Sequence, residues 1–291
     1  MTQDLTIALH AGAHKTATTH LQRTLMDNKV LLERAGITFR GPNAFRNPGE
    51  TLRHMFEIGR RMEDPFPGGP LALLKKLAAG RKRLIISEEN FFGSLNPPDG
   101  PFRRHLYRNG PGRLEILAAR VRPHPIDLFF AVRDQATFMQ SAHSQVLLSG
   151  RRVSLDEYLN GLRPEQISWF SLIEELVNKN AARRIWIWRY EDYPAVQEKI
   201  YANLLTCDIA SRIVPHPKQV NQSLSRAAVK ACLSDSPGSP SGQEARMLHP
   251  VSDVNPRYEG FSSEARRLSR ARYENDLVRI EELKGVQLLK P

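Results

Sequence analysis

The amino-acid sequence predicts a three-layer α/β fold, in which helices cover both faces of a central parallel sheet of about four to five strands. Short apolar segments alternate along the chain with longer stretches of helical periodicity, which is the pattern of repeated strand–helix units. The first apolar segment also runs through a short polar loop directly into a helix. With 291 residues, the chain is long enough to bury the core of one large domain, so we expect residues 1–291 to form a single domain.

Four segments have the composition of strands that are buried on both faces, because each is short, apolar and rich in β-branched or aromatic residues. They are Leu5 to Leu9, Arg83 to Ser87, Ile126 to Val132 and Arg184 to Trp188. Crossovers between parallel strands are right-handed, so the carboxyl ends of these strands should lie along one edge of the sheet. The polar residues expected at that edge are Lys15, Glu88, Arg133 and Arg189.

Helical periodicity separates and follows the strands. The predicted helices are Thr18 to Arg34, Glu50 to Met62, Leu71 to Ala79, Arg113 to Arg122, Gln135 to Leu148 and Pro164 to Lys179. The segment 234–263 is rich in proline, glycine and serine, which predicts a long surface loop or a lid. The periodicity returns in residues 262–283 and predicts a C-terminal helix.

The junction between the first strand and the first helix has the composition of an anion-binding loop. Residues 10–19 read His-Ala-Gly-Ala-His-Lys-Thr-Ala-Thr-Thr. A helix that begins straight after a strand directs backbone N–H groups and the positive end of its dipole over the strand's end. Lys15 adds a mobile charge, and Thr16, Thr18 and Thr19 add hydroxyl donors. The alternative is an ordinary junction with a capping threonine.

Comparison with the nucleotide-binding loop GxxxxGK[ST] fails at both glycines, which are replaced by Leu9 and His14. The sequence therefore predicts a P-loop-like arrangement with a shorter loop around one phosphate. A second phosphate contact is expected from Arg133, at the end of a strand, and Ser141, on the following helix, because a guanidinium presents fork geometry to an anion. The alternative is a surface pair of Arg133 with Asp134.

Charge and cysteine content narrow the functional classes. The formal charge of +11, from 42 basic and 31 acidic residues, favours an anionic partner. Cys207 and Cys232 lack the spacing of metal ligands, so we expect a reducing compartment and no metal site. The sequence holds no apolar stretch near the roughly 20 residues of a membrane span and no secretory leader, which predicts a cytoplasmic protein.

Together these segments resemble the sulfotransferase family that uses 3′-phosphoadenosine 5′-phosphosulfate, in particular its small bacterial members. Residues 10–19 are similar to the family's 5′-phosphosulfate loop, whose pattern is close to Pro-Lys-Ser/Thr-Gly-Thr-Thr. Arg133 and Ser141 match its 3′-phosphate pair in kind and spacing. Residues 83–89 and 188–193 look like its central strands with the turns that follow them, and residues 221–226 resemble the segment before its closing helices.

The resemblance implies transfer of a sulfuryl group from 3′-phosphoadenosine 5′-phosphosulfate to a hydroxyl or amine, without a metal. It leaves the acceptor open among a glycan, a glycolipid, an oligosaccharide and a small alcohol. It assigns Lys15 to the leaving oxygen and Glu88 to the catalytic base, with Glu89 as second candidate. The donor-binding residues that it implies are Gly12, His14, Lys15, Thr16, Ala17, Thr18, Thr19, Arg133 and Ser141.

The sequence departs from the family pattern at several positions. Ala17 replaces the usual loop glycine and would be strained at positive φ. His14 replaces a common proline, and His20 stands where many animal cytosolic members have a tryptophan that stacks on adenine. Without an Arg-Lys-Gly motif near the C-terminus, Lys218 and Arg226 are the substitutes for its phosphate contact.

Two other functions fit parts of the pattern. A nucleotide kinase would use a triphosphate-wrapping loop and a magnesium-holding acid, for which Asp127 and Glu88 are candidates. A nucleic-acid-binding protein would use the basic residues, including those at 103, 104, 105 and 108, but the chain shows no recognised nucleic-acid module. We therefore expect a small-molecule or carbohydrate partner rather than a nucleic acid.

Overall fold

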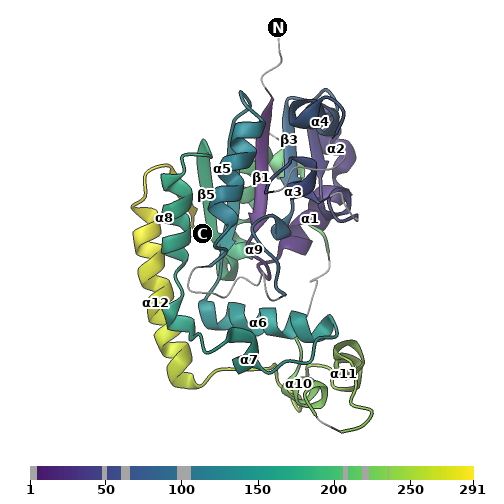
Figure 1. The fold of residues 1–291 in the computed structure, drawn as a ribbon, viewed down its shortest axis with the longest axis vertical. Helices are drawn as coiled ribbons and strands as arrows, with labels where there is room; N and C mark the ends of the chain where they lie inside the picture. The colour runs from purple at the N-terminus through teal and green to yellow at the C-terminus, as the bar shows by residue number, and fades with distance from the viewer. Residues whose placement is uncertain are drawn as a thin grey trace.

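The computed structural model describes residues 5–47, 51–59, 66–96, 106–205, 209–217, 223–234 and 236–291. Its centre is a six-stranded sheet in the order β2-β3-β1-β4-β5-β6. Every neighbouring pair of strands is parallel. Helices cover both faces of this sheet, which confirms the predicted three-layer α/β class (Figure 1).

The strands are β1 (Thr6–Gly12), β2 (Ile37–Arg40), β3 (Arg83–Ser87), β4 (Ile126–Val132), β5 (Arg184–Arg189) and β6 (Val286–Leu289). The helices are α1 (Thr18–Asp27), α2 (Lys29–Arg34), α3 (Leu52–Met55), α4 (Gly69–Ala78), α5 (Gly110–Arg120), α6 (Gln135–Leu148), α7 (Leu155–Leu159), α8 (Trp169–Asn178), α9 (Tyr193–Leu205), α10 (Arg226–Cys232), α11 (Gly242–Leu248) and α12 (Ser263–Glu281). Short 3-10 turns are η1 (Pro42–Ala44), η2 (Glu89–Phe91), η3 (Pro164–Gln166), η4 (Tyr190–Asp192) and η5 (Ala210–Arg212).

The two faces of the sheet pack into separate cores because successive strand residues point to opposite sides. In β4, Leu128 and Phe130 face the core that includes α5, α8 and α12, whereas Phe129 and Ala131 face the core of α1 and α9. All seven residues of β4 are buried, as expected for a central parallel strand. A third, small cluster joins α10 and α11 to the end of α6, below the sheet in Figure 1.

The sheet has two strands beyond those predicted. β2 and β6 lie at opposite edges and are short, with four residues each. Buried and exposed residues do not alternate along β6, in which only Val286 is buried. A short edge strand carries little period-two signal, so pairing with β5 decides its conformation.

Several predicted helices have different bounds. The stretch 18–34 is divided at Asn28, whose side-chain amide donates to the Thr24 carbonyl (2.8 Å) and to the Val214 carbonyl (2.9 Å). The stretch 164–179 becomes η3 followed by α8, which begins after the capping serine Ser168. Within the predicted helix 50–62, the described residues form only α3; residue 50 and residues 60–62 lie outside the description.

The prediction of a loop over 234–263 is wrong for residues 242–248, which form α11. Ser241 and Glu244 make a capping box, a signal that the sequence contains as Ser-x-x-Glu. Gly242 is required for close packing, because a Cβ there would lie 2.2 Å from the carbonyl oxygen of Leu147. The C-terminal helix predicted over 262–283 is confirmed as α12.

The amino edge of the sheet is closed by a buried charge cluster. Asp127, near the start of β4, pairs with Arg83 (2.9 Å) and Arg183 (2.7 Å). Arg83 is buried and also donates to the Leu204 carbonyl (3.1 Å). These arginines lower the pKa of the Asp127 carboxyl against the opposing effect of its burial. Asp127 is therefore an ion-paired structural group at the edge opposite Lys15.

The carboxyl edge is covered by α6, which begins just after β4 and lies below the sheet in Figure 1. Helix α12 holds the start of α6: the Ser269 hydroxyl donates to Asp134 Oδ2 (2.9 Å) and accepts from the Ala136 N–H (2.9 Å). Gln135 Nε2 donates to the buried Asp276 (3.2 Å). These contacts fix the residues on either side of the β4–α6 turn.

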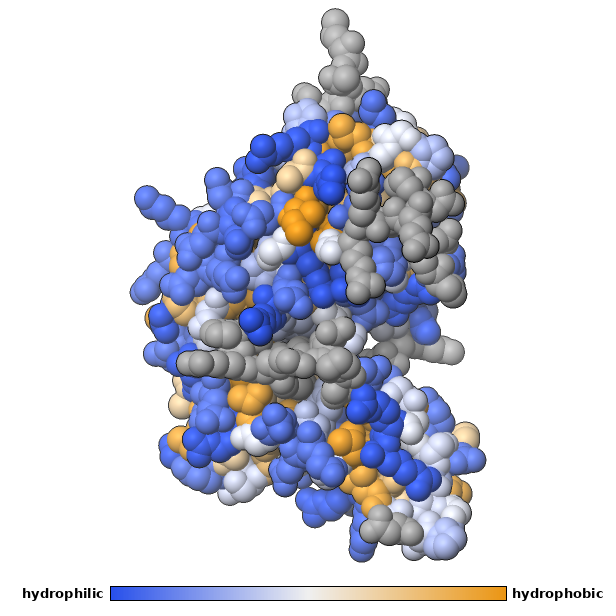
Figure 2. Space-filling model, in the orientation of Figure 1, coloured by the Kyte–Doolittle hydropathy of each residue, from blue (hydrophilic) through white to orange (hydrophobic). Residues whose placement is uncertain are grey.

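The surface seen in Figure 2 is mostly hydrophilic, and its hydrophobic areas are small and separate. Among the described helices, none combines the length and the apolar character that a membrane span requires.

Candidate anion-binding site

The loop from β1 to α1 has an uncommon backbone. Gly12 ends β1 with φ 122°, and a Cβ there would lie 3.3 Å from the backbone nitrogen of His14. Lys15 (φ 60°) and Ala17 (φ 63°) both lie in the left-handed region. Each such non-glycine residue costs about 1–2 kcal/mol. Ala17 is thus strained, as expected for a residue that replaces glycine at positive φ.

Contacts from other elements hold the loop in this conformation. The Ala13 N–H donates to the Ala131 carbonyl of β4 (3.0 Å), and Arg133 Nη1 donates to the Lys15 carbonyl (2.7 Å). The Thr16 hydroxyl donates to the Ala13 carbonyl (2.6 Å), so it closes the loop instead of serving as the anion donor that the sequence predicts. Strained residues persist where the surroundings over-determine them, and here a central strand supplies that constraint.

The N-terminus of α1 carries neither a side-chain cap nor an acidic residue in its first turn. Ala17 occupies the N-cap position and cannot accept a hydrogen bond with its side chain. Thr18 and Thr19 form the beginning of the helix. The positive end of the helix dipole therefore faces the loop without a negative side chain of the helix itself to balance it.

Lys15 adds a cation that no described carboxylate pairs with. Its Nζ donates to Gln145 Oε1 on α6 (3.2 Å). Burial and the charge of Arg133 lower the pKa of the Lys15 ammonium to about 8, although Glu89 opposes the shift. A partly buried ammonium without an ion pair gains free energy from an anion that replaces lost hydration.

Arg133 is the second cation. Its Nε donates to the Thr137 hydroxyl (3.0 Å), and its guanidinium lies over the Tyr190 ring, 4.3 Å from the centroid. The described residues give it no carboxylate at ion-pair distance, so the alternative of a surface pair with Asp134 is wrong; the Asp134 side chain instead accepts from Ser269 and from the Thr137 N–H. Burial lowers the pKa of Arg133.

One face of α6 brings these groups together. Thr137, Ser141 and Gln145 are spaced by four residues and therefore lie along one side of the helix. Thr137 contacts Arg133 and Gln145 contacts Lys15, so the buried Ser141 lies between the two contacts. The predicted group of Lys15, Arg133 and Ser141 is thus assembled at one place, and Gln145 joins it.

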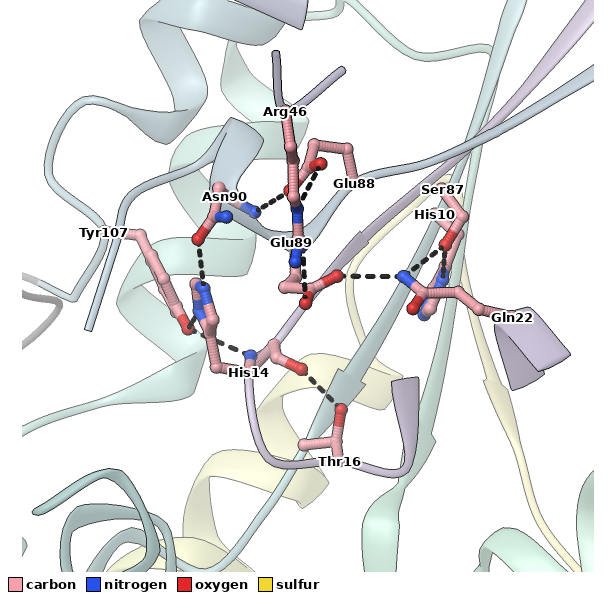
Figure 3. Close-up of polar contacts among 11 residues, drawn as sticks. His10, His14, Thr16, Gln22, Arg46, Ser87, Glu88, Glu89, Asn90 and Tyr107 are labelled. Carbon is pink, nitrogen blue, oxygen red and sulfur yellow. Dashed lines mark hydrogen bonds and ion pairs between the residues drawn. The ribbon is translucent and has the colours of Figure 1, made fainter. Parts of the chain in front are cut away.

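Two acidic residues follow β3 beside the loop (Figure 3). Glu88 Oε1 accepts from Arg46 Nη2 (2.9 Å), and its Oε2 accepts from Arg46 Nε (3.0 Å). The N–H of Asn90 donates to the same carboxylate (2.9 Å). Burial raises the pKa of Glu88 despite these contacts. Both oxygens of Glu88 are therefore engaged by groups other than the loop.

Glu89 lies closer to the loop. Its Cβ is 3.6 Å from where a Cβ on Gly12 would stand, and its charge raises the pKa of Lys15. Glu89 pairs with Arg46 (2.8 Å) and accepts from Gln22 Nε2 (2.9 Å). Although burial opposes ionisation, the charge and hydrogen bond of Arg46 hold the pKa of Glu89 at about 2. Alternation along a strand would point Glu88 and Glu89 to opposite faces of the sheet. Because β3 ends at Ser87, this alternation does not separate the two acids, and both contact Arg46.

The remaining predicted positions are placed as follows. His14 is buried and contacts Tyr107 and Asn90 (Figure 3). His20 Nδ1 lies 3.0 Å from the Tyr193 hydroxyl, and its Nε2 lies 2.9 Å from the His216 carbonyl. Arg189 shares the carboxyl edge but pairs with Asp192 (3.4 Å) and Glu274 (3.6 Å).

Some expectations fall elsewhere. Arg226 begins α10. Lys218, Asn221 and Gln222, the basic residues at 103–105 and Cys207 lie outside the described residues. The described part of the chain contains no cluster of histidine, cysteine and acidic residues able to hold a metal ion.

Sequence reasoning missed Arg46, Asn90, Tyr107 and Gln145. Gln145 had a usable signal, because it stands four residues after Ser141 on a well-predicted helix. Arg46 and Tyr107 come from irregular segments distant in sequence, so only the folded chain brings them to the loop.

Comparison with known proteins adds little. No family model matches this chain, and no curated protein matches it. A solved structure with some likeness is the 54 kDa signal recognition particle protein of Aeropyrum pernix K1 in complex with GDP, at 14% identity and a TM-score of 0.32. The match covers 71% of this chain and 41% of that one, and similarity at this level carries no argument about function.

The strain at Ala17 predicts that glycine stabilises the protein at this position, whereas glycine usually destabilises it. We expect Ala17→Gly to raise the free energy of unfolding by about 1 kcal/mol, because glycine adopts positive φ without the Cβ clash. The control is Ala202→Gly, at an exposed position of α9, which should lose about 1 kcal/mol. Urea unfolding of both variants measures the difference, and equal losses would refute the strain at residue 17.

The lowered pKa of Lys15 predicts pH-dependent anion binding. The ammonium must be protonated to attract an anion, so affinity for adenosine 3′,5′-bisphosphate should be steady near pH 7 and fall as pH rises through about 8. Above this pH the affinity should fall by at most about tenfold per pH unit, because one proton is involved. Calorimetric titration with the bisphosphate from pH 7 to 10 measures this fall. Lys15→Arg should remove the decline, because arginine stays charged; an unchanged decline in that variant would assign it to another group.

Proposed function

We propose that this protein is a sulfotransferase that transfers the sulfuryl group of 3′-phosphoadenosine 5′-phosphosulfate to a hydroxyl or amine of an acceptor. The observation that carries the proposal is the pairing of Lys15 with Arg133 beside the uncapped start of α1, with no described carboxylate at ion-pair distance from either. The charge of Arg133 lowers the pKa of Lys15, so the two like charges repel, and an anion between or beside them would stabilise the arrangement.

Two groups of anion donors favour a ligand with two separated phosphates. The first comprises the α1 start and Lys15, and it suits the 5′-phosphosulfate. The second comprises Arg133 and Ser141, and it suits the 3′-phosphate that distinguishes this donor from ATP. In this assignment Thr16 acts by closing the loop, and Gly12, His14 and Ala17 shape its backbone.

Sulfuryl transfer needs few covalent contributions from the protein. The acceptor oxygen or nitrogen forms a bond to sulfur, the bond from sulfur to the bridging phosphate oxygen breaks, and the acceptor proton passes to a base. Negative charge grows on the departing oxygen, where Lys15 is the cation available to stabilise it. Adenosine 3′,5′-bisphosphate leaves as the second product. By analogy with phosphoryl transfer, positioning and charge stabilisation dominate.

The geometry favours Glu89 over Glu88 as the proton acceptor in this proposal. Glu89 lies beside Gly12 of the loop and is the acid whose charge acts on Lys15, and this placement is the reason for the assignment. Arg46 and Gln22 engage its two oxygens, and its pKa of about 2 makes it a weak base. Glu88 is held by Arg46 through both oxygens and also caps η2 through the Asn90 N–H. We therefore assign Glu88 to orienting Arg46 and the turn after β3.

The kinase alternative loses both of its proposed magnesium ligands. Asp127 lies at the amino edge of the sheet between two arginines, and Glu88 is paired with Arg46. The loop also lacks the glycine that a triphosphate-wrapping turn requires before its lysine.

A calorimetric titration tests the donor site. We expect adenosine 3′,5′-bisphosphate to bind more tightly than ATP with magnesium, and Arg133→Ala to weaken the bisphosphate at least tenfold, because a charge-assisted hydrogen bond of about 1.5–3 kcal/mol is lost. The matched control is Arg189→Ala, at the end of the neighbouring strand, whose arginine already pairs with acids. Preference for ATP with magnesium would support the kinase function, and failure to bind either would refute the donor site.

Activity assays separate the two acids. Once an acceptor is found, Glu89→Gln should lower kcat by about 10²-fold, the lower end of the contribution of a general base, because its pKa of about 2 makes it a weak base. Glu88→Gln should cause a smaller loss. Bisphosphate affinity measured on both variants controls for damage to the loop. A larger loss of kcat in Glu88→Gln would reverse the assignment.

A further inference from the structure

The loop residue before Lys15 is fixed by a side chain from a distant segment. Tyr107, which precedes α5, contacts His14 through one hydroxyl oxygen. The backbone N–H of His14 donates to this oxygen (3.1 Å), and His14 Nδ1 lies 2.7 Å from it. Figure 3 shows both contacts, with the Tyr107 side chain reaching the loop from the opposite side to Thr16.

The hydrogen-bond partners determine how the His14 ring is protonated. His14 Nε2 lies 3.0 Å from the carbonyl oxygen of the Asn90 side chain, which can only accept, so Nε2 carries the hydrogen. A neutral ring then leaves Nδ1 as an acceptor, and the Tyr107 hydroxyl donates to it. The same hydroxyl oxygen accepts from the His14 backbone. Each hydrogen in this contact has one acceptor, with the Tyr107 hydroxyl serving as both donor and acceptor.

Burial keeps the two groups in these protonation states. His14 and Tyr107 are 6% and 3% exposed. Burial lowers the pKa of the imidazole and raises the pKa of the phenol, so both remain neutral at ordinary pH. The ring of Tyr107 packs against Phe130 of β4 and Phe138 of α6, with centroids 6.1 and 6.5 Å away. It therefore rests on the two elements that flank Arg133.

We propose that Tyr107 is a positioning residue of the anion-binding loop, which acts through His14 to hold Lys15 in its left-handed conformation. Arg133 fixes the Lys15 carbonyl, and Tyr107 fixes the backbone N–H of the preceding residue. With both contacts present, the strained Lys15 has little freedom to relax. The proposal rests on the proposed function only in the choice of ligand for the binding test.

Tyr107→Phe removes the hydroxyl and keeps the ring. We expect this variant to bind adenosine 3′,5′-bisphosphate about tenfold more weakly, because the loop loses two hydrogen bonds. NMR of the ring nitrogens should show His14 in the Nε2–H form in the wild type and a mixture of tautomers in the variant. The matched control is Tyr158→Phe, because Tyr158 is also buried but donates to the Leu95 carbonyl (2.8 Å) and not to a residue of the loop.

A pair of His14 variants tests the route of the effect and covers a failure of Tyr107→Phe to fold. Asparagine can replace Nδ1 as acceptor toward Tyr107, whereas glutamine can replace only Nε2 toward Asn90. We expect His14→Asn to lose less affinity than His14→Gln, and the reverse order would overturn the proposal. Unchanged affinity together with an unchanged His14 tautomer in Tyr107→Phe would also overturn it. If the wild type binds no bisphosphate, the proposed function fails, while an altered His14 tautomer in Tyr107→Phe would still support the positioning role.

Discussion

Two positive side chains meet at the carboxyl edge of the sheet, and no described carboxylate forms an ion pair with either. Arg133 donates to the backbone carbonyl of Lys15. The guanidinium therefore supplies one of the two positive charges and also fixes the backbone of Lys15, which supplies the second. Burial lowers the pKa of each group, which means that the folded protein holds both charges with part of their hydration lost. The start of α1 adds to this positive charge. The proposed anion would relieve this cost, and the surrounding contacts hold the loop in the shape that the proposal requires.

Arginine and acidic residues occur at both edges of the sheet, but their charges are paired differently at the two edges. At the amino edge Arg83 and Arg183 share Asp127, and the charges are balanced within the protein. At the carboxyl edge the nearby acids Glu88 and Glu89 are held by Arg46, which leaves Lys15 and Arg133 without an ion pair among the described residues. Net charge alone does not distinguish these two environments, but the pairing does.

The loop depends on segments far apart in the chain. Its positive-φ residues are unfavourable locally, so the conformation persists because β4, α6 and the segment before α5 each hold one part of it. Helix α12 reaches the same place from the C-terminal end of the chain through Ser269 and Asp134. This explains how a loop without the usual glycines keeps a defined shape.

The sequence by itself determined the α/β class, the four central strands, α6 and α12, because long apolar or periodic segments carry strong local signals. It also indicated Lys15, Arg133 and Ser141 as one group, since parallel strands end at a common edge. Only the tertiary structure decided that Thr16 closes the loop, that Glu89 lies nearer than Glu88, and that Arg46, Tyr107 and Gln145 take part. Edge strands β2 and β6 were likewise decided by pairing. Hydrogen bonds and ion pairs between distant segments leave no periodic trace in the sequence, so their partners become known only when the chain is folded.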